Sequence, residues 1–268
     1  MSNNDVDSAM RARVCAQLRD IEQRYNVRVL YACESGSRGW GFASPDSDYD
    51  VRFLYVHRPE WYLRVESQRD VIELPIDDEL DVCGWEWRKA LGLLKGANPT
   101  LIEWLDSPVV YQEDETVVAE LRALIPAWFS PLRARWHYYS MARKNFRGYL
   151  QGETVRLKKY FYVLRPLLAA RWVEAGKGVP PMRFAELLAG SELCVPLRAE
   201  IDALLEIKQR AGEAEYGPKR PLLHAFLQSE LVRGEVPPVL PDSREGNLKD
   251  LDSLLMRTVM KRDRKSVV

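Results

Sequence analysis

Two aspartates separated by one residue stand at the head of an apolar run, in Asp48-Tyr49-Asp50 followed by Val51 to Val56. In an extended strand, side chains two positions apart leave the same face, so these two carboxylates would lie about 6 to 7 Å apart. Two ionised carboxylates at that distance repel each other, and a shared cation relieves the repulsion. Mg²⁺ prefers carboxylate oxygens and leaves room for substrate phosphates, so the pair predicts a magnesium site.

A pair of small residues, Gly36-Ser37, precedes these aspartates by a gap of ten residues and follows the strand-like stretch Val27 to Cys33. Backbone amides at a strand end and a serine hydroxyl can donate to a phosphate. Glycine allows the backbone to approach a ligand closely. Arg38 and Arg52 stand nearby as candidate partners, either for a phosphate or for the acidic cluster.

A third acid, Asp81, lies between Leu80 and Val82 in a second strand-like stretch. A buried charge flanked by apolar residues needs a partner. A two-metal centre holds its ions about 3.5 to 4 Å apart and needs further ligands, so Asp81 is the candidate third carboxylate. The alternative for the first pair is an Asx-type turn, because Pro45-Asp46-Ser47 is itself typical of a turn.

Short strands and helices must position these residues. The periodicity predicts a helix over residues 8–24, strands over 27–33, 51–56, 71–74 and 80–83, and helices after residue 84 and over 100–105. From about Thr116 onward the pattern is helical throughout, ending in a helix over 248–260. The chain has 268 residues, of which 46% are apolar, and suits two domains, which we place at 1–115 and 116–268.

The ends and the hydropathy bear on the compartment. No window of about 18 apolar residues occurs, and the first ten residues have neither a basic region nor an apolar region typical of a signal peptide. The sequence therefore predicts a cytoplasmic protein with no membrane partner.

Charge is sorted along the chain although the net charge is zero: residues 60–120 carry fifteen acids against five bases, and residues 133–172 carry ten bases against one acid. The basic stretch is interleaved with aromatic residues, a combination that suits phosphate and base binding. Lys158 and Lys159 are the candidate triphosphate contacts, and Tyr139 and Tyr160 the candidate base-stacking residues. The alternative is a pair of amphipathic helices with aromatic core faces and solvated charges.

Four segments together resemble a known family: GSRGWGFASPDSDYDVRF, LDVCGWEWRKAL, NPTLIEWLDSP and KKYFYVLRPLLAARW. The spacing of Gly36-Ser37, Asp48-x-Asp50 and Asp81 resembles the DNA polymerase β-type nucleotidyltransferases. The four segments resemble more specifically their RNA repair pathway branch, called RlaP. The likeness extends over roughly residues 25 to 175.

The resemblance implies an α+β fold, with an N-terminal polymerase β-like nucleotidyltransferase domain built on a mixed sheet and an all-helical C-terminal domain. It implies two Mg²⁺ ions, with Mn²⁺ as a substitute, and transfer of a nucleoside monophosphate from an NTP with pyrophosphate leaving. Asp48 and Asp50 would ligate metal, and Asp81 would ligate metal and orient or deprotonate the acceptor hydroxyl. Gly36 and Ser37 would hold the triphosphate.

The branch resembled favours RNA as the acceptor. A protein side chain as acceptor, as in protein-nucleotidylating (AMPylating) enzymes, fits the same metal centre. A catalytically inactive module that binds nucleotide or RNA is a third possibility, and clustered acids argue against it because phosphates must approach the same place.

Overall fold

The computed structural model describes residues 6–76, 79–210, 215–236, 239–242 and 244–263. These residues form two compact units, each assembled from segments distant in the sequence. The sheet unit comprises 6–36, 48–129 and 244–263, and the helical unit comprises 37–47 and 130–242, with the gaps just given. The division of the sequence into 1–115 and 116–268 stays a prediction.

The centre of the sheet unit is a five-stranded sheet of order β3-β4-β2-β1-β5. Its strands are β1 (Arg28–Glu34), β2 (Tyr49–Val56), β3 (Val71–Glu73), β4 (Leu80–Glu86) and β5 (Val110–Glu113). The central pair, β2 and β4, is parallel, and the other pairs are antiparallel. The predicted mixed sheet is confirmed, and β5 is a strand that the sequence pattern did not predict.

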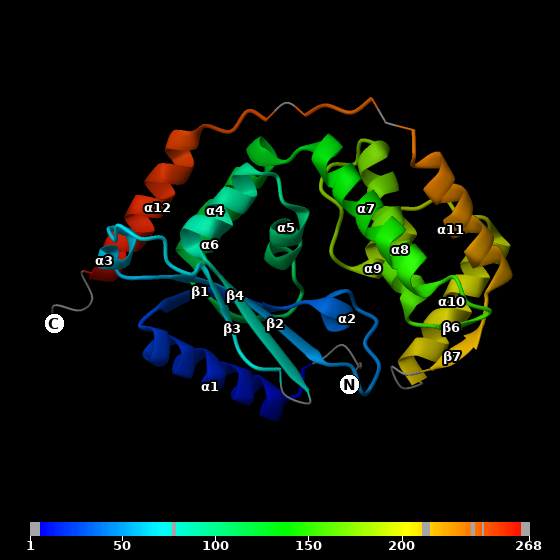
Figure 1. Ribbon diagram of the computed structural model, residues 1–268, viewed down its shortest axis with the longest axis horizontal. Helices are drawn as coiled ribbons and strands as arrows, with labels where there is room; N and C mark the ends of the chain where they lie inside the picture. Colours follow the sequence, from blue (N-terminus) through cyan, green and yellow to red (C-terminus); the bar gives the residue numbers. More distant parts are fainter. Residues whose placement is uncertain (1–5, 77–78, 211–214, 237–238, 243, 264–268) are drawn as a thin grey trace. The chain divides into compact units, whose positions relative to one another are not determined.

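One face of this sheet is covered by α1 (Ser8–Tyr25), the predicted N-terminal helix (Figure 1). Asp7 caps its first turn by accepting hydrogen bonds from the backbone N–H groups of Ala9 and Met10. The apolar positions of α1 are buried against alternate residues of β2, which include Val51 and Phe53. Alternation along β2 therefore sends its odd-numbered residues toward α1 and its even-numbered residues toward the opposite face.

The opposite face packs against helices, and its core joins Leu54 and Val56 of β2 to Trp87 and Leu91. These helices are α4 (Trp87–Lys95), α5 (Pro99–Leu105), α6 (Glu115–Trp128) and α12 (Leu248–Asp263), with the short α3 (Pro59–Tyr62) beside α12. The predicted helices after residue 84, over 100–105 and over 248–260 are confirmed, and their observed ends differ from the predicted ones by at most three residues.

The helical unit is built on the antiparallel packing of two long helices (Figure 1). Its helices are α7 (Pro131–Tyr149), α8 (Lys159–Glu174), α9 (Phe184–Ala189), α10 (Val195–Arg210) and α11 (Pro221–Arg233). The prediction of helices here is confirmed, although the pattern missed a two-stranded antiparallel pair, β6 (Thr154–Arg156) with β7 (Tyr216–Pro218). Across the described residues, no helix is both long and apolar enough to cross a membrane.

The segment 37–47 belongs to the helical unit by its side-chain contacts. The ring of Phe42 lies 5.0 Å from that of Phe161 and 5.5 Å from that of Phe184, centroid to centroid. Trp40 stacks edge-on against Tyr162 at 5.5 Å. The short helix α2 (Gly36–Gly39) thus begins in the sheet unit and continues into the helical unit.

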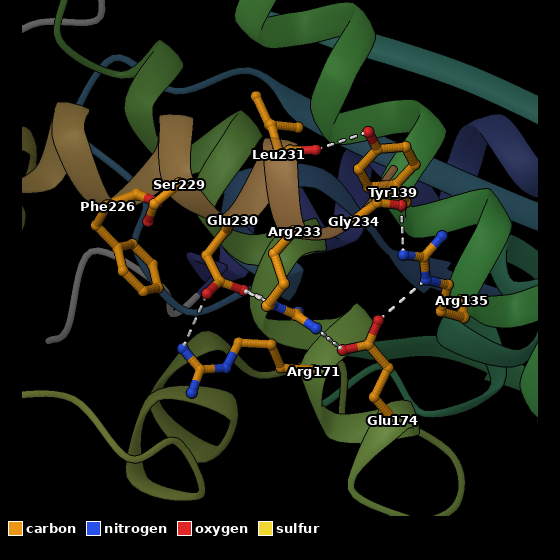
Figure 2. A network of polar contacts seen from close by, with 10 residues as sticks. All are labelled: Arg135, Tyr139, Arg171, Glu174, Phe226, Ser229, Glu230, Leu231, Arg233 and Gly234. Atoms are coloured by element: carbon orange, nitrogen blue, oxygen red, sulfur yellow. Dashed lines mark hydrogen bonds and ion pairs between the residues drawn. The ribbon is translucent and has the colours of Figure 1, made fainter. Parts of the chain in front are cut away.

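A network of ion pairs connects the long helices of this unit (Figure 2). Arg135 of α7, which is 1% exposed, donates from Nε to Glu174 Oε1 at 3.0 Å and from Nη2 to the carbonyl of Gly234 at 2.6 Å. Arg233 of α11 reaches the second oxygen of Glu174 at 2.7 Å and also pairs with Glu230. Glu174 is therefore the anion shared by a buried arginine and a half-exposed one.

Glu174→Gln should destabilise the protein by about 3 kcal/mol, because the neutral amide leaves the buried Arg135 guanidinium without its counter-charge. Asp202→Asn is the matched control, because Asp202 pairs with Arg198 at 3.0 Å on the exposed surface of α10. Its loss should cost less than about 1 kcal/mol. Urea denaturation of both variants measures the difference, and equal losses would show that the Arg135 pair contributes no more than a surface pair.

Candidate active site

The parallel pairing of β2 and β4 sets Asp50 directly beside Asp81, since the two residues are register partners. Partners on adjacent parallel strands point to the same face of the sheet, about 4.8 Å apart in the backbone. Both carboxylates are partly exposed, at 30% and 31% of their side-chain surface. Two acids from separate strands therefore meet at one accessible place.

Arg52 lies between these two acids. Its Nη2 donates to Asp50 Oδ1 at 2.9 Å and to Asp81 Oδ2 at 2.7 Å. Burial alone would lower the pKa of the Arg52 guanidinium, but its hydrogen bond to Asp81 and the charges of both acids raise that pKa overall. The sequence left a phosphate and the acidic cluster as possible partners of Arg52. In the structure, Arg52 contacts the acidic cluster.

The backbone of Asp50 is held by Glu34, at the end of β1. Glu34 is fully buried, and its Oε1 accepts the backbone N–H of Asp50 at 2.8 Å. Its other oxygen accepts a hydrogen bond from the Tyr111 hydroxyl. Burial raises the pKa of Tyr111, and the Glu34 charge raises it further, so the tyrosine remains a donor at neutral pH. The sequence analysis did not identify Glu34. The feature that could have identified it is an acidic residue at the end of an apolar strand.

Gly36 approaches Asp50 so closely that no side chain fits. Its φ is +55°, and a Cβ built on it would lie 1.9 Å from Asp50 Oδ2. Glycine therefore serves two purposes here, a left-handed backbone and contact with the carboxylate. The close approach brings the predicted Gly36 and Asp50 together within the sheet unit.

The predicted phosphate-binding residues of the helical unit are largely buried. Ser37 is buried, and Arg38, also buried, donates from Nη2 to the carbonyl of Ser47 at 2.7 Å, which braces the two ends of the 37–47 segment. Lys158 is 9% exposed and is the N-cap residue of α8. Lys159 is half-buried, with its ammonium 4.1 Å from the ring centre of Tyr149.

A lysine outside the predicted set also meets this segment. Lys208 of α10 is 5% exposed and its Nζ donates to Ser44 Oγ at 2.8 Å and to Ser47 Oγ at 3.3 Å. Its signal in the sequence is a lysine at helical spacing from Ile201 and Leu204, a position that should be apolar. The 37–47 segment is thus held by Arg38 from within and by Lys208 from α10.

The sequence matches the family described as RlaP, the RNA repair pathway DNA polymerase beta family, over residues 10–257. The chain belongs to this family. RlaP membership makes it a nucleotidyltransferase of the polymerase β type, and the match extends well beyond the motifs quoted above.

Two further proteins are similar to this RlaP chain. It is 46% identical over 251 residues to "Uncharacterized protein YcgL" of Bacillus subtilis (strain 168), covering 93% of this chain and 96% of that protein. A solved structure of a nucleotidyltransferase-like protein from Exiguobacterium sibiricum 255-15 is 14% identical, with a TM-score of 0.30, covering 92% of this chain and 76% of that one. The family assignment therefore depends on the sequence match.

The carboxylates of the RlaP chain suit a magnesium ion in their chemistry. Mg²⁺ in phosphate-handling sites is held by one or two carboxylates together with substrate phosphates. Asp50 and Asp81 supply two, and they already share one cationic nitrogen. Asp48 is exposed and lies just before β2, and within the described part of the chain no three acidic, cysteine or histidine side chains are grouped closely enough to hold a metal by themselves. The role of Asp48 as a metal ligand stays a prediction.

The aromatic residues predicted to stack on a base lie in the core. Tyr139 is 3% exposed and donates its hydroxyl to the carbonyl of Leu231 at 2.8 Å (Figure 2). Tyr160 is fully buried, and its hydroxyl accepts the backbone N–H of Arg220. Neither ring offers a free face to a base in this structure, which favours the alternative that these rings belong to the core of the helical unit.

Proposed function

We propose that this chain transfers a nucleoside monophosphate from an NTP to a hydroxyl group of an RNA in a reaction that depends on Mg²⁺. One observation carries the proposal. Asp50 and Asp81, from two adjacent parallel strands, direct one oxygen each at a single cationic nitrogen. Carboxylates that converge on one place can hold the Mg²⁺ that a nucleotidyl transfer of this kind uses.

The transfer itself exchanges one phosphorus–oxygen bond for another. The acceptor oxygen forms a bond to the α-phosphorus, the bond from that phosphorus to the bridging oxygen of the β-phosphate breaks, and pyrophosphate leaves. The hydroxyl proton passes to the carboxylate of Asp81. Bound Mg²⁺ would stabilise the charge that develops on the phosphate oxygens.

The chain's own residues position the reacting groups. Asp50 and Asp81 would ligate the metal, with Asp48 as a further ligand, and Glu34 would hold the backbone of Asp50 in place through the bond described above. Gly36 would let the turn after β1 approach the carboxylate without a clash. Ser37 and the buried Arg38 would contribute to holding the triphosphate.

RNA is the proposed acceptor because the family is described as belonging to an RNA repair pathway. The exposed cations of α7, Arg143, Lys144 and Arg147, support the same choice, since phosphate contacts supply most of the affinity in nucleic-acid binding. A protein hydroxyl would take part in the same chemistry. A transfer assay that offers both RNA and protein distinguishes these two acceptors.

The test is transfer of label from each of the four α-³²P-labelled NTPs, with Mg²⁺, to RNA and to protein. We expect label on RNA that is lost with a chelator and in Asp81→Asn. Label only on protein would support a protein-nucleotidylating enzyme. Label on neither, with any NTP, would contradict the proposal and favour a nucleotide-binding module.

Replacing both Lys158 and Lys159 by alanine should raise the KM for the NTP about tenfold, a loss of about 1.4 kcal/mol in binding. The reason is the removal of two cations predicted to contact the triphosphate. Arg19→Ala with Arg24→Ala is the matched control, because it removes the same charge from exposed positions of α1. Steady-state kinetics measures both, and an unchanged KM in the Lys158/Lys159 variant would assign these lysines a structural role.

A further inference from the structure

Arg52 occupies the position where the two acids converge. Its Nη2 lies 2.9 Å from Asp50 Oδ1 and 2.7 Å from Asp81 Oδ2, while its Nη1 donates to the carbonyls of Val51 at 3.1 Å and Asp81 at 3.2 Å. The guanidinium side chain is only 17% exposed. The arginine is therefore held by four acceptors and is not a loosely placed surface residue.

Electrostatics explains why a cation stands there. Asp50 and Asp81 are register partners, and two negative charges so close repel each other unless a cation stands between them. Arg52 comes from the same strand as Asp50, two positions later, so alternation places all three side chains on one face. The strand itself thus carries the counter-charge for the acids.

A divalent metal would bind the same two carboxylates. Mg²⁺ lies about 2.0 to 2.1 Å from its oxygen ligands, and Arg52 donates to one oxygen of each carboxylate, so the metal would come close to the guanidinium. Two cations so close repel each other. Arg52 therefore opposes binding of the metal, and bound metal weakens the Arg52 contacts.

We propose that Arg52 is a resident counter-ion, which holds Asp50 and Asp81 aligned before metal binds and competes with the metal for these two carboxylates. It is a positioning residue that sets the metal affinity of the site. This inference depends on the proposed function only in that a divalent ion binds at Asp50 and Asp81. It does not depend on which group is transferred or to which acceptor.

The test compares metal binding in Arg52→Met and in the unchanged chain, without nucleotide or RNA. Mn²⁺ affinity is measured by electron paramagnetic resonance, and stabilisation by Mg²⁺ is measured as the shift in Tm. Without metal, Arg52→Met should melt lower, because two adjacent carboxylates are left uncompensated. With metal, it should bind Mn²⁺ about tenfold more tightly and show the larger Mg²⁺-induced shift in Tm.

Arg28→Met is the matched control. Arg28 lies on β1 of the same sheet, is 25% exposed, and pairs at 2.7 Å with a single carboxylate, that of Asp114. Its replacement should lower Tm without changing the affinity for Mn²⁺. Arg52→Lys is the second variant, in which the point charge of an ammonium group replaces the forked guanidinium. Its Mn²⁺ affinity should fall between that of the unchanged chain and that of Arg52→Met.

Unchanged or weaker Mn²⁺ binding in Arg52→Met would overturn the inference, as would the absence of Mn²⁺ binding in every variant. If Arg52→Met does not fold, Arg52→Lys decides in the same way. The labelled-NTP assay is separate. A chain that transfers no label but gains metal affinity in Arg52→Met would contradict the proposed function and support the role of Arg52.

Discussion

Asp50→Asn should abolish nucleotide transfer, with a rate loss on the order of 1000-fold, because metal stabilisation of the transition state contributes several kcal/mol. The amide keeps the size of the carboxylate but lacks its charge. Asp50 is one of two acids that share the cationic nitrogen of Arg52, so its neutralisation removes a negative charge from the predicted metal position.

The same substitution should leave the fold intact. The Asp50 side chain is 30% exposed, and the backbone bond from its N–H to Glu34 does not involve the side chain. The amide oxygen of asparagine can still accept from Arg52, and removing one of two like charges relieves repulsion with Asp81. We expect the free energy of unfolding to change by less than about 1 kcal/mol.

Asp70→Asn is the control for this experiment, because Asp70 pairs with Lys89 at 2.9 Å in the same unit and is also partly exposed. Both variants are compared by Tm and by the initial rate of label transfer at a saturating Mg²⁺ concentration. Asp70→Asn should retain full transfer. An Asp50→Asn rate within tenfold of the unchanged chain would show that this carboxylate is not a metal ligand.

The sequence indicates candidate acids through their local patterns, and the structure brings Asp50 and Asp81 together. Asp81 lies on the polar side of the alternation Leu80-Asp81-Val82, and Asp48-x-Asp50 opens a strand where apolar residues are expected. Both strands form as predicted. What the sequence could not show is their pairing: β3 lies between β2 and β4 in the chain, yet β2 and β4 are the direct, parallel neighbours.

Residues that act through long-range contacts were harder to predict. Glu34 acquires its role only because β1 pairs with β2 and β5, which brings Asp50 and Tyr111 to its two oxygens. Lys208 meets Ser44 across 164 positions of sequence. No local pattern specifies such contacts, because they depend on which elements become neighbours.

Local rules also failed where two of them compete. Asn98 follows a helix and precedes Pro99, and asparagine is common both at the C-terminal end of one helix and at the N-cap of the next. In the structure Asn98 is the N-cap of α5, and its side chain accepts the N–H of Leu101 at 3.1 Å. Pro99 decides the outcome, since proline is well suited to the first position of a helix.

Gly36→Ala should reduce transfer about 100-fold, because a displacement of the order of 1 Å at a catalytic group costs about that much. The new Cβ would lie 1.9 Å from Asp50 Oδ2 and 2.8 Å from its Cγ, so the carboxylate must leave its place or the turn after β1 must shift. The left-handed φ adds a backbone cost of about 1 to 2 kcal/mol.

Gly176→Ala separates these two effects. Gly176 has a similar φ of +69°, and a Cβ there would meet nothing within 4 Å. In urea denaturation, Gly176→Ala should lower the free energy of unfolding by the same backbone contribution. It should leave the rate of label transfer unchanged. Equal rates in Gly36→Ala and Gly176→Ala would show that the contact between Gly36 and Asp50 is not needed for transfer.

A double variant tests the clash itself. In an Asp50→Ala background the atoms nearest the new Cβ, Oδ2 and Cγ of Asp50, are absent. In that background Gly36→Ala should lower the free energy of unfolding only by the backbone contribution that Gly176→Ala measures. If Gly36→Ala costs as much in that background as in the unchanged chain, strain in the turn, and not the carboxylate, requires glycine at position 36.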